Sequence, residues 1–148
     1  MSAIERIDRF VVDAPIVLKW IFPEPRWSTA RRILSADISV LAPDVILSHI
    51  GTLLSTHVRI GDLADHEADE VLRVVGLMPL QLHKTWSLAT DALEIERRIR
   101  CSMPACVYLA LALREDAVYL TANRELYKCV QDSGLAANIE WLGNLALC

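Results

Sequence analysis

The feature that most constrains the fold is a repeated change of hydrophobic period along the chain. Short apolar runs rich in branched side chains alternate with longer segments whose apolar residues recur every three or four positions. Because short connections join these segments, the alternation predicts a central, mostly parallel sheet of four to five short strands with helices on both faces. The expected fold class is a single α/β domain over residues 1–148. The expected strands lie within RFVVDA, ISVLA, PLQLH, AVYLT and NIEWL.

The segments between these strands carry signals for helix starts and ends. Asp44 is expected to cap a long helix that stops at Gly61, and the last helix is expected to end at Gly134. The segment PACVYLALALRE is almost entirely apolar, which predicts a buried helix. The expected helices are IVLKWIF (limited by two prolines), RWSTARRIL, VILSHIGTLLSTHVRIG, HEADEVLRVVGLM, TWSLATDALEIERRI, PACVYLALALRE and ANRELYKCVQDSG.

Charge and composition limit the possible partners and location. The chain has 15 basic and 19 acidic residues, a net charge of −4, so nucleic-acid binding would require a local basic patch. No apolar run is long enough to span a bilayer, and MSAIERIDRF lacks the order of a signal peptide, so we expect a cytoplasmic protein with no membrane partner. The cysteines lack the close paired spacing of zinc sites. We expect free thiols, with Cys106 and Cys129 among apolar residues.

Candidate site residues gather at the predicted carboxyl ends of the strands, where ligands bind in open α/β sheets. Asp13 follows the first strand and Asn123 follows the fourth. His49 and Thr52 share one polar stripe of the long helix. Asp13 has two compatible interpretations, a helix cap before Pro15 or part of a site.

Two further residues also have alternative interpretations. His49 is either hydrogen-bonded to a neighbour or a metal ligand. Glu125 is either a first-turn helix acid or a substitute acid for the site. Each of these residues at the carboxyl edge of the sheet thus has both a structural and a chemical interpretation.

Four segments and their order resemble the PIN domain of VapC-type toxins. They are VVDAPIVLKWIFPEP, LAPDVILSHIGTLL, SMPACVYLALAL and YLTANREL, followed by a closing IEWLG. The resemblance implies a PIN-like domain, a magnesium-dependent ribonuclease activity, a homodimer and inhibition by a small antitoxin. It also implies a cluster of four acids, which end the first strand, lie on the long helix, begin the buried helix and follow the fourth strand.

This chain departs from the acidic pattern at three of the four positions. Asp13 matches the first acid, but His49 stands at the glutamate of E-x-x-N, with Thr52 at its asparagine. Ala105 stands at the aspartate of S-x-x-D, and Asn123 at that of T-x-D. Because magnesium requires hard oxygen ligands, Asp13 is interpreted as the remnant of an acidic cluster and as the metal ligand only if a metal binds.

The sequence therefore predicts a VapC-like protein of toxin–antitoxin descent with an impaired nuclease site. It would act by binding RNA or a protein partner, including an antitoxin-like protein or a second copy of itself. The tentative binding residues are His49, Thr52, Asn123 and Glu125, and no cofactor is expected. The alternative is an active Mg²⁺- or Mn²⁺-dependent endoribonuclease with Asp13, His49 and Glu125 as rearranged ligands. A third hypothesis is an unrelated α/β module that binds a small neutral ligand.

Overall fold

The computed structural model describes residues 7–22, 27–34 and 37–145. Its centre is a five-stranded sheet in the order β3-β2-β1-β4-β5, and every neighbouring pair is parallel. The predicted α/β class and parallel sheet are thus confirmed. The strands are β1 (Arg9–Val12), β2 (Ser39–Pro43), β3 (Leu80–His83), β4 (Val118–Thr121) and β5 (Ile139–Trp141).

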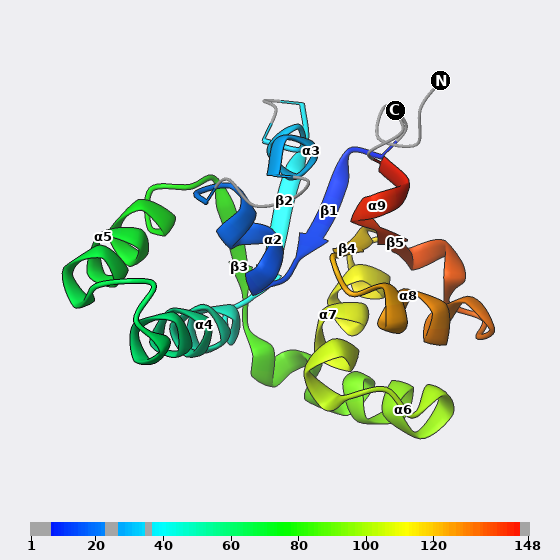
Figure 1. The fold of residues 1–148 in the computed structure, drawn as a ribbon. Helices are drawn as coiled ribbons and strands as arrows, with labels where there is room; N and C mark the ends of the chain where they lie inside the picture. Colours follow the sequence, from blue (N-terminus) through cyan, green and yellow to red (C-terminus); the bar gives the residue numbers. More distant parts are fainter. Residues whose placement is uncertain (1–6, 23–26, 35–36, 146–148) are drawn as a thin grey trace.

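Helices cover both faces of this sheet (Figure 1). The strand order is consistent with this arrangement, because the chain moves outward from β1 to β3 and then returns across the sheet to β4, and a reversal of direction moves the connecting helices to the other face. The helix α7 packs on β1, β2 and β4 and also contacts α6, whereas α2 contacts α3 and α4. The helices are α2 (Ala14–Lys19), α3 (Trp27–Arg31), α4 (Ile46–Ile60), α5 (Asp65–Val75), α6 (Ala89–Ile99), α7 (Met103–Arg114), α8 (Arg124–Gln131) and α9 (Leu142–Leu145), with 3₁₀ turns η1 (Thr85–Leu88) and η2 (Ala136–Asn138).

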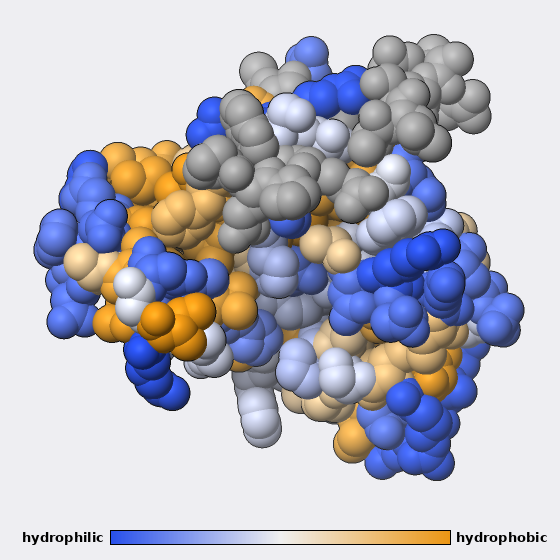
Figure 2. Space-filling model, in the orientation of Figure 1, coloured by the Kyte–Doolittle hydropathy of each residue, from blue (hydrophilic) through white to orange (hydrophobic). Residues whose placement is uncertain are grey.

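The buried core follows the predicted apolar segments. Every residue of α7 from Ala105 to Ala112 is buried, which confirms the prediction for PACVYLALALRE. Apolar side chains also gather at the surface where α2, α4 and α5 meet (Figure 2). Among the described residues, none of the helices has the length and apolar character needed to cross a membrane.

Helix termini confirm some of the predicted signals and correct others. Gly61 ends α4 with a left-handed backbone, φ +88°, as predicted. Asp44 does not cap α4, because its Oδ1 accepts a hydrogen bond from Thr85 N (3.0 Å) and thereby joins the start of α4 to η1. The last predicted helix ends at Gln131 rather than Gly134, and there the Ser133 hydroxyl donates to Val130 O (2.7 Å).

The cysteines of the described residues are free thiols, but the predicted environment of one of them was wrong. Cys106 is buried, as predicted, whereas Cys129, on α8, is exposed. The prediction for Cys129 was wrong because α8 is amphipathic and contributes only Val130 to the buried set. Cys148 lies outside the described residues.

Candidate functional site

A pocket of about 380 Å³ opens at the carboxyl edge of the sheet. The parallel pairing of β1 and β4 brings the ends of both strands together there, and α4 and α7 lie on either side of the end of β1 (Figure 1). The lining residues are Asp13, Ala14, Pro15, His49, Thr52, Leu53, Ser102, Pro104, Ala105, Tyr108, Tyr119, Thr121, Asn123 and Leu126.

Four of the five predicted site residues meet in this pocket. Asp13, His49, Thr52 and Asn123 line it, although they come from three separate parts of the chain. Glu125 is exposed and does not belong to the lining. The structure thus brings together the residues predicted from strand ends and from the long helix. It leaves out the acid that was considered as a substitute.

Asp13 is held at the floor of the pocket by two hydrogen bonds. Its Oδ1 accepts from Ile16 N (3.3 Å) and caps α2, and its Oδ2 accepts from the Tyr119 hydroxyl (2.7 Å). The predicted cap is therefore present. The side chain is only 9 % exposed, and burial raises the pKa of Asp13 to about 6 although the hydrogen bonds oppose this shift. A carboxylate at this position is thus substantially desolvated.

Two tyrosines connect Asp13 to His49 across the pocket. Tyr108 stacks on Tyr119 with a centroid separation of 5.4 Å, and the Tyr108 hydroxyl lies 2.8 Å from His49 Nδ1. This contact confirms the interpretation of His49 as a histidine hydrogen-bonded to a neighbour. Burial lowers the pKa of His49 and raises the pKa of both tyrosines. At neutral pH these three side chains are uncharged.

The sequence analysis did not select Tyr108 or Tyr119 as site residues, although a signal was present. Each is a hydroxyl-bearing side chain within an apolar element, α7 or β4. Because a buried hydroxyl needs a hydrogen-bond partner, such residues point to a nearby polar group. In this fold the polar groups are Asp13 and His49.

The remaining polar groups of the pocket stabilise helix starts. Ser102 Oγ accepts from Ala105 N (3.4 Å) and caps α7. Asn123 Oδ1 accepts from Leu126 N (3.1 Å) and caps α8. Thr121 is fully buried, and its Oγ1 accepts from Asn123 N (3.0 Å). The side-chain oxygens of Ser102 and Asn123 therefore already accept hydrogen bonds from backbone N–H groups.

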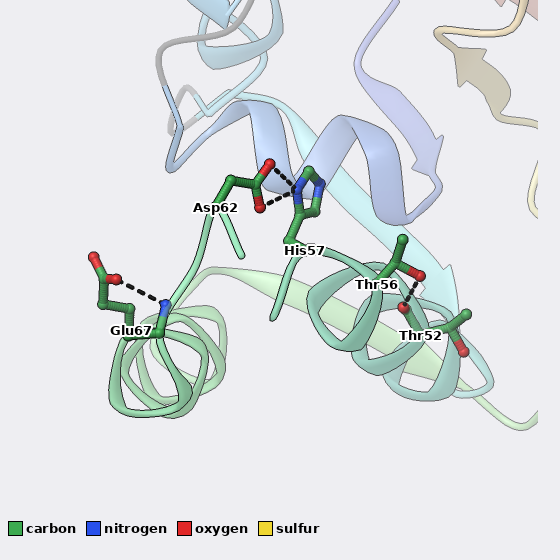
Figure 3. Close-up of polar contacts among 6 residues, drawn as sticks. Thr52, Thr56, His57, Asp62 and Glu67 are labelled. Carbon is green, nitrogen blue, oxygen red and sulfur yellow. Dashed lines mark hydrogen bonds and ion pairs between the residues drawn. The ribbon is translucent and has the colours of Figure 1, made fainter. Parts of the chain in front are cut away.

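The polar stripe of α4 also bonds within its own helix. Thr52 Oγ1 donates to Ser48 O (3.0 Å). Thr56 Oγ1 donates to Thr52 O (3.0 Å), as Figure 3 shows. At the far end of the helix, His57 Nδ1 lies 3.0 Å from Asp62 (Figure 3), which places this histidine outside the pocket. The hydroxyl protons of Thr52 and Thr56 are thus used within α4.

Comparisons with known proteins agree on one fold. A family model described as PIN domain matches residues 10–130. No curated protein sequence gives a significant match.

Several solved structures of low sequence identity are similar to this chain. One is VapBC2 from Rickettsia felis bound to a DNA fragment from their promoter (TM-score 0.65, 12% identity, 90% of this chain and 98% of that chain). Another is a toxin–antitoxin complex from Klebsiella pneumoniae (0.60, 13%, 88% and 94%). A third is VapC20 from Mycobacterium tuberculosis, described as a Sarcin-Ricin loop cleaving toxin (0.57, 18%, 73% and 84%). At these identities the likeness concerns the fold.

Proposed function

Because the chain belongs to the PIN-domain family, we propose that it is a VapC-like protein that has lost magnesium-dependent RNA cleavage and acts by binding a protein partner. One observation carries the first half of this proposal. Among the described residues, Asp13 is the only carboxylate that lines the pocket, and both of its oxygens already accept hydrogen bonds from the protein.

The side chains of the pocket do not suit a magnesium ion. Mg²⁺ prefers oxygen ligands in near-ideal octahedral geometry and is usually held by carboxylates. The four positions that correspond to family acids hold Asp13, His49, Ala105 and Asn123. The His49 Nδ1 atom pairs with Tyr108, Ala105 supplies only a methyl group, and the Asn123 oxygen caps α8. Among the residues that the structure describes, no group of three or more His, Cys, Asp or Glu side chains could hold a metal.

Loss of the metal would remove the main source of rate enhancement in this type of cleavage. A bound metal ion lowers the pKa of the attacking water and stabilises charge on the phosphate, which is worth several kcal/mol. Each 1.36 kcal/mol corresponds to a factor of about ten in rate. The neutral Tyr108–His49 pair offers no equivalent charge. We therefore expect the activity to be lower than that of a complete site by a few powers of ten.

The alternative of an active enzyme with rearranged ligands has no geometric support in this pocket. It requires Glu125 beside Asp13 and His49, but Glu125 is exposed and outside the lining. The hypothesis of a neutral small ligand has the pocket in its favour, but no observation identifies such a ligand.

Charge and surface character favour a protein partner over RNA. In the part of the chain that the structure describes, no lysine or arginine lines the pocket, and phosphate contacts supply most of the affinity of nucleic-acid binding. Apolar side chains instead gather where α2, α4 and α5 meet (Figure 2). A recess of about 170 Å³ near this region is lined by Phe22, His57, Asp62 and Leu63. We therefore propose an antitoxin-like polypeptide as the partner, in agreement with the toxin–antitoxin complexes of the same fold.

Two measurements test this proposal. The first incubates the purified protein with structured RNA in Mg²⁺ or Mn²⁺, beside the Asp13→Ala variant. We expect no cleavage that depends on Asp13. RNA cleavage that is abolished both by Asp13→Ala and by a chelator would overturn the proposal.

The second measurement captures partners on the tagged protein from native cell extract. We expect a small polypeptide in stoichiometric amount, lost with Phe22→Ala and retained with Leu93→Ala. Leu93 is a matched control because it is an exposed leucine on α6 that does not line the recess. Thermal melting of both variants establishes that they are folded. Capture of RNA alone, of a second copy of this chain alone, or equal capture by all three forms would contradict an antitoxin-like partner at this recess.

A further inference from the structure

Two thiols that are 28 residues apart in the sequence lie in direct contact at the surface. The Sγ atoms of Cys101 and Cys129 are 3.1 Å apart. The length of a disulfide bond is about 2.0 Å, so an approach of roughly 1 Å would join them. Cys101 lies in the turn between α6 and α7, and Cys129 lies in α8. The contact therefore links the α6–α7 turn to α8.

One backbone carbonyl positions both thiols. Cys129 Sγ donates to Ile99 O (3.7 Å), and Cys101 Sγ approaches the same oxygen (4.0 Å). The nearby Cys106 points elsewhere, since its Sγ donates to Cys101 O (3.9 Å) and its side chain is buried. The shared acceptor makes Cys101 and Cys129 a defined pair within a group of three cysteines.

The pair is accessible and has no role in the pocket. Cys129 is exposed and Cys101 is partly exposed, and neither residue lines the pocket. A zinc site does not explain the cluster, because no group of three potential ligands with suitable geometry occurs in the described part of the chain. Exposed, adjacent thiols are the arrangement in which oxidation leads to a disulfide.

We propose that Cys101 and Cys129 form an oxidisable dithiol, which peroxides convert to a disulfide that ties the start of α7 to α8. This inference does not depend on the proposed function. The ligand class of the site is a peroxide, with hydrogen peroxide as its simplest member. The residues next to the bond are part of the pocket wall, since Ser102 follows Cys101 directly and Leu126 lies one turn before Cys129 on α8.

The reaction proceeds in two balanced steps. The thiolate of Cys129 attacks one oxygen of hydrogen peroxide, the O–O bond breaks, and hydroxide leaves and is protonated to water. The product is a sulfenic acid on Cys129. Cys101 then attacks this sulfur, the S–S bond forms, the S–O bond breaks, and the hydroxyl group leaves as water with the proton of Cys101. Overall, two thiols lose two electrons and one peroxide is reduced to two molecules of water.

The order of the steps follows from the environment of each thiol. Cys129 is the more exposed thiol and therefore meets the oxidant first. Burial and the neighbouring thiol raise the pKa of Cys101 to about 12, so Cys101 is protonated at neutral pH and is a poor nucleophile toward the oxidant. The second step should therefore accelerate as the pH rises.

The first experiment maps the bond by mass spectrometry after treatment with hydrogen peroxide. Trypsin cuts after Arg100, Arg114 and Lys128, so each of the two relevant peptides contains two cysteines. Cys148→Ser and Cys106→Ala variants remove the second cysteine from each peptide and make the assignment unique. We expect the link between the two peptides in the wild type and in both of these variants, with the loss of two hydrogen atoms from the intact mass.

The matched variant for the pair itself is Cys129→Ser, which changes an exposed side chain and preserves its size. We expect this variant to lose the link completely. A link that persists in Cys129→Ser, a link that forms only between two chains on a non-reducing gel, or full labelling of Cys101 and Cys129 by iodoacetamide after peroxide treatment would overturn the inference.

A second readout is thermal stability. A bond that closes a loop of this length restricts the unfolded chain and should raise the melting temperature by roughly 5–10 °C. We expect this rise after oxidation of the wild type and of Cys148→Ser, reversed by a thiol reductant, and no rise for Cys129→Ser. A mapped bond without any change in the melting temperature would contradict the proposed tie between α7 and α8.

Discussion

The most informative substitution is Asp13→Asn, because it removes the charge at the floor of the pocket and preserves most of the local hydrogen bonds. Asparagine is as good a helix cap as aspartate, so its side-chain oxygen can still accept from Ile16 N. Its amide group can donate to the Tyr119 hydroxyl, which now donates to Asp13. The difference between the two proteins therefore reports mainly on the ionisation of Asp13.

The sign and the size of the effect follow from the pKa. Burial raises the pKa of Asp13 from 3.8 to about 6, so the native state binds more protons than the unfolded state between these values. The free energy of unfolding must then fall as the pH rises through this window. The full effect is about 3 kcal/mol, of which about 2 kcal/mol falls between pH 4.5 and pH 7.5.

Urea denaturation at a series of pH values measures this effect. Because all other titrating groups are common to both proteins, the difference in unfolding free energy isolates Asp13. We expect Asp13→Asn to gain about 2 kcal/mol relative to the wild type between pH 4.5 and pH 7.5. Asp13→Ala is the control for the helix cap. It should be less stable than Asp13→Asn by about 1 kcal/mol at every pH, because alanine cannot cap the helix.

A difference between wild type and Asp13→Asn that is constant across this pH range would refute the reasoning. It would mean that Asp13 is solvated or is paired with a cation in the folded protein. If Asp13→Asn instead became less stable relative to the wild type as the pH rises, this would point to a cation beside Asp13. A charged partner lowers the pKa of a carboxyl group.

Four further substitutions test local features of the fold, each by urea denaturation. Gly61→Ala should cost about 1 kcal/mol of folding stability because Gly61 has φ +88°. Gly51→Ala within α4 should stabilise the protein by about 0.5–1 kcal/mol, because the added Cβ would meet no atom within 4 Å beyond the backbone of its own helix. Equal effects of the two substitutions would contradict this contrast. Ser102→Ala should cost about 1 kcal/mol through the lost cap of α7, and an unchanged midpoint would show that the cap is unimportant. Tyr108→Phe should cost about 1–2 kcal/mol because His49 loses its partner, and a neutral result would indicate that water replaces the hydroxyl.

The sheet and the position of the pocket could be predicted from the sequence because both depend on local signals. The apolar runs set the strands, and parallel pairing places Asp13 and Asn123 at one edge. The cap formed by Ser102 and the stop at Gly61 were also predictable, since each depends on a few neighbouring residues.

Contacts between distant segments were less predictable. Asp44 had the correct residue type and position for a cap, but it bonds to Thr85, which is 41 residues away. The pairing of Tyr119 with Asp13 spans 106 residues, and no periodicity within either segment indicates it. Cys129 was misjudged for a related reason, because the orientation of a short helix on the sheet decides which of its side chains are exposed.

The most direct test of the central claim, that this PIN domain lacks a working metal site, is a calorimetric titration with Mn²⁺ and Mg²⁺. Mn²⁺ is the more permissive probe because it accepts imidazole as well as carboxylate ligands. A variant that combines His49→Glu, Ala105→Asp and Asn123→Asp provides the matched control with all four acids present. We expect no saturable binding of either ion to the wild type and clear binding to the combined variant. Tight binding to the wild type that Asp13→Ala abolishes would contradict the claim.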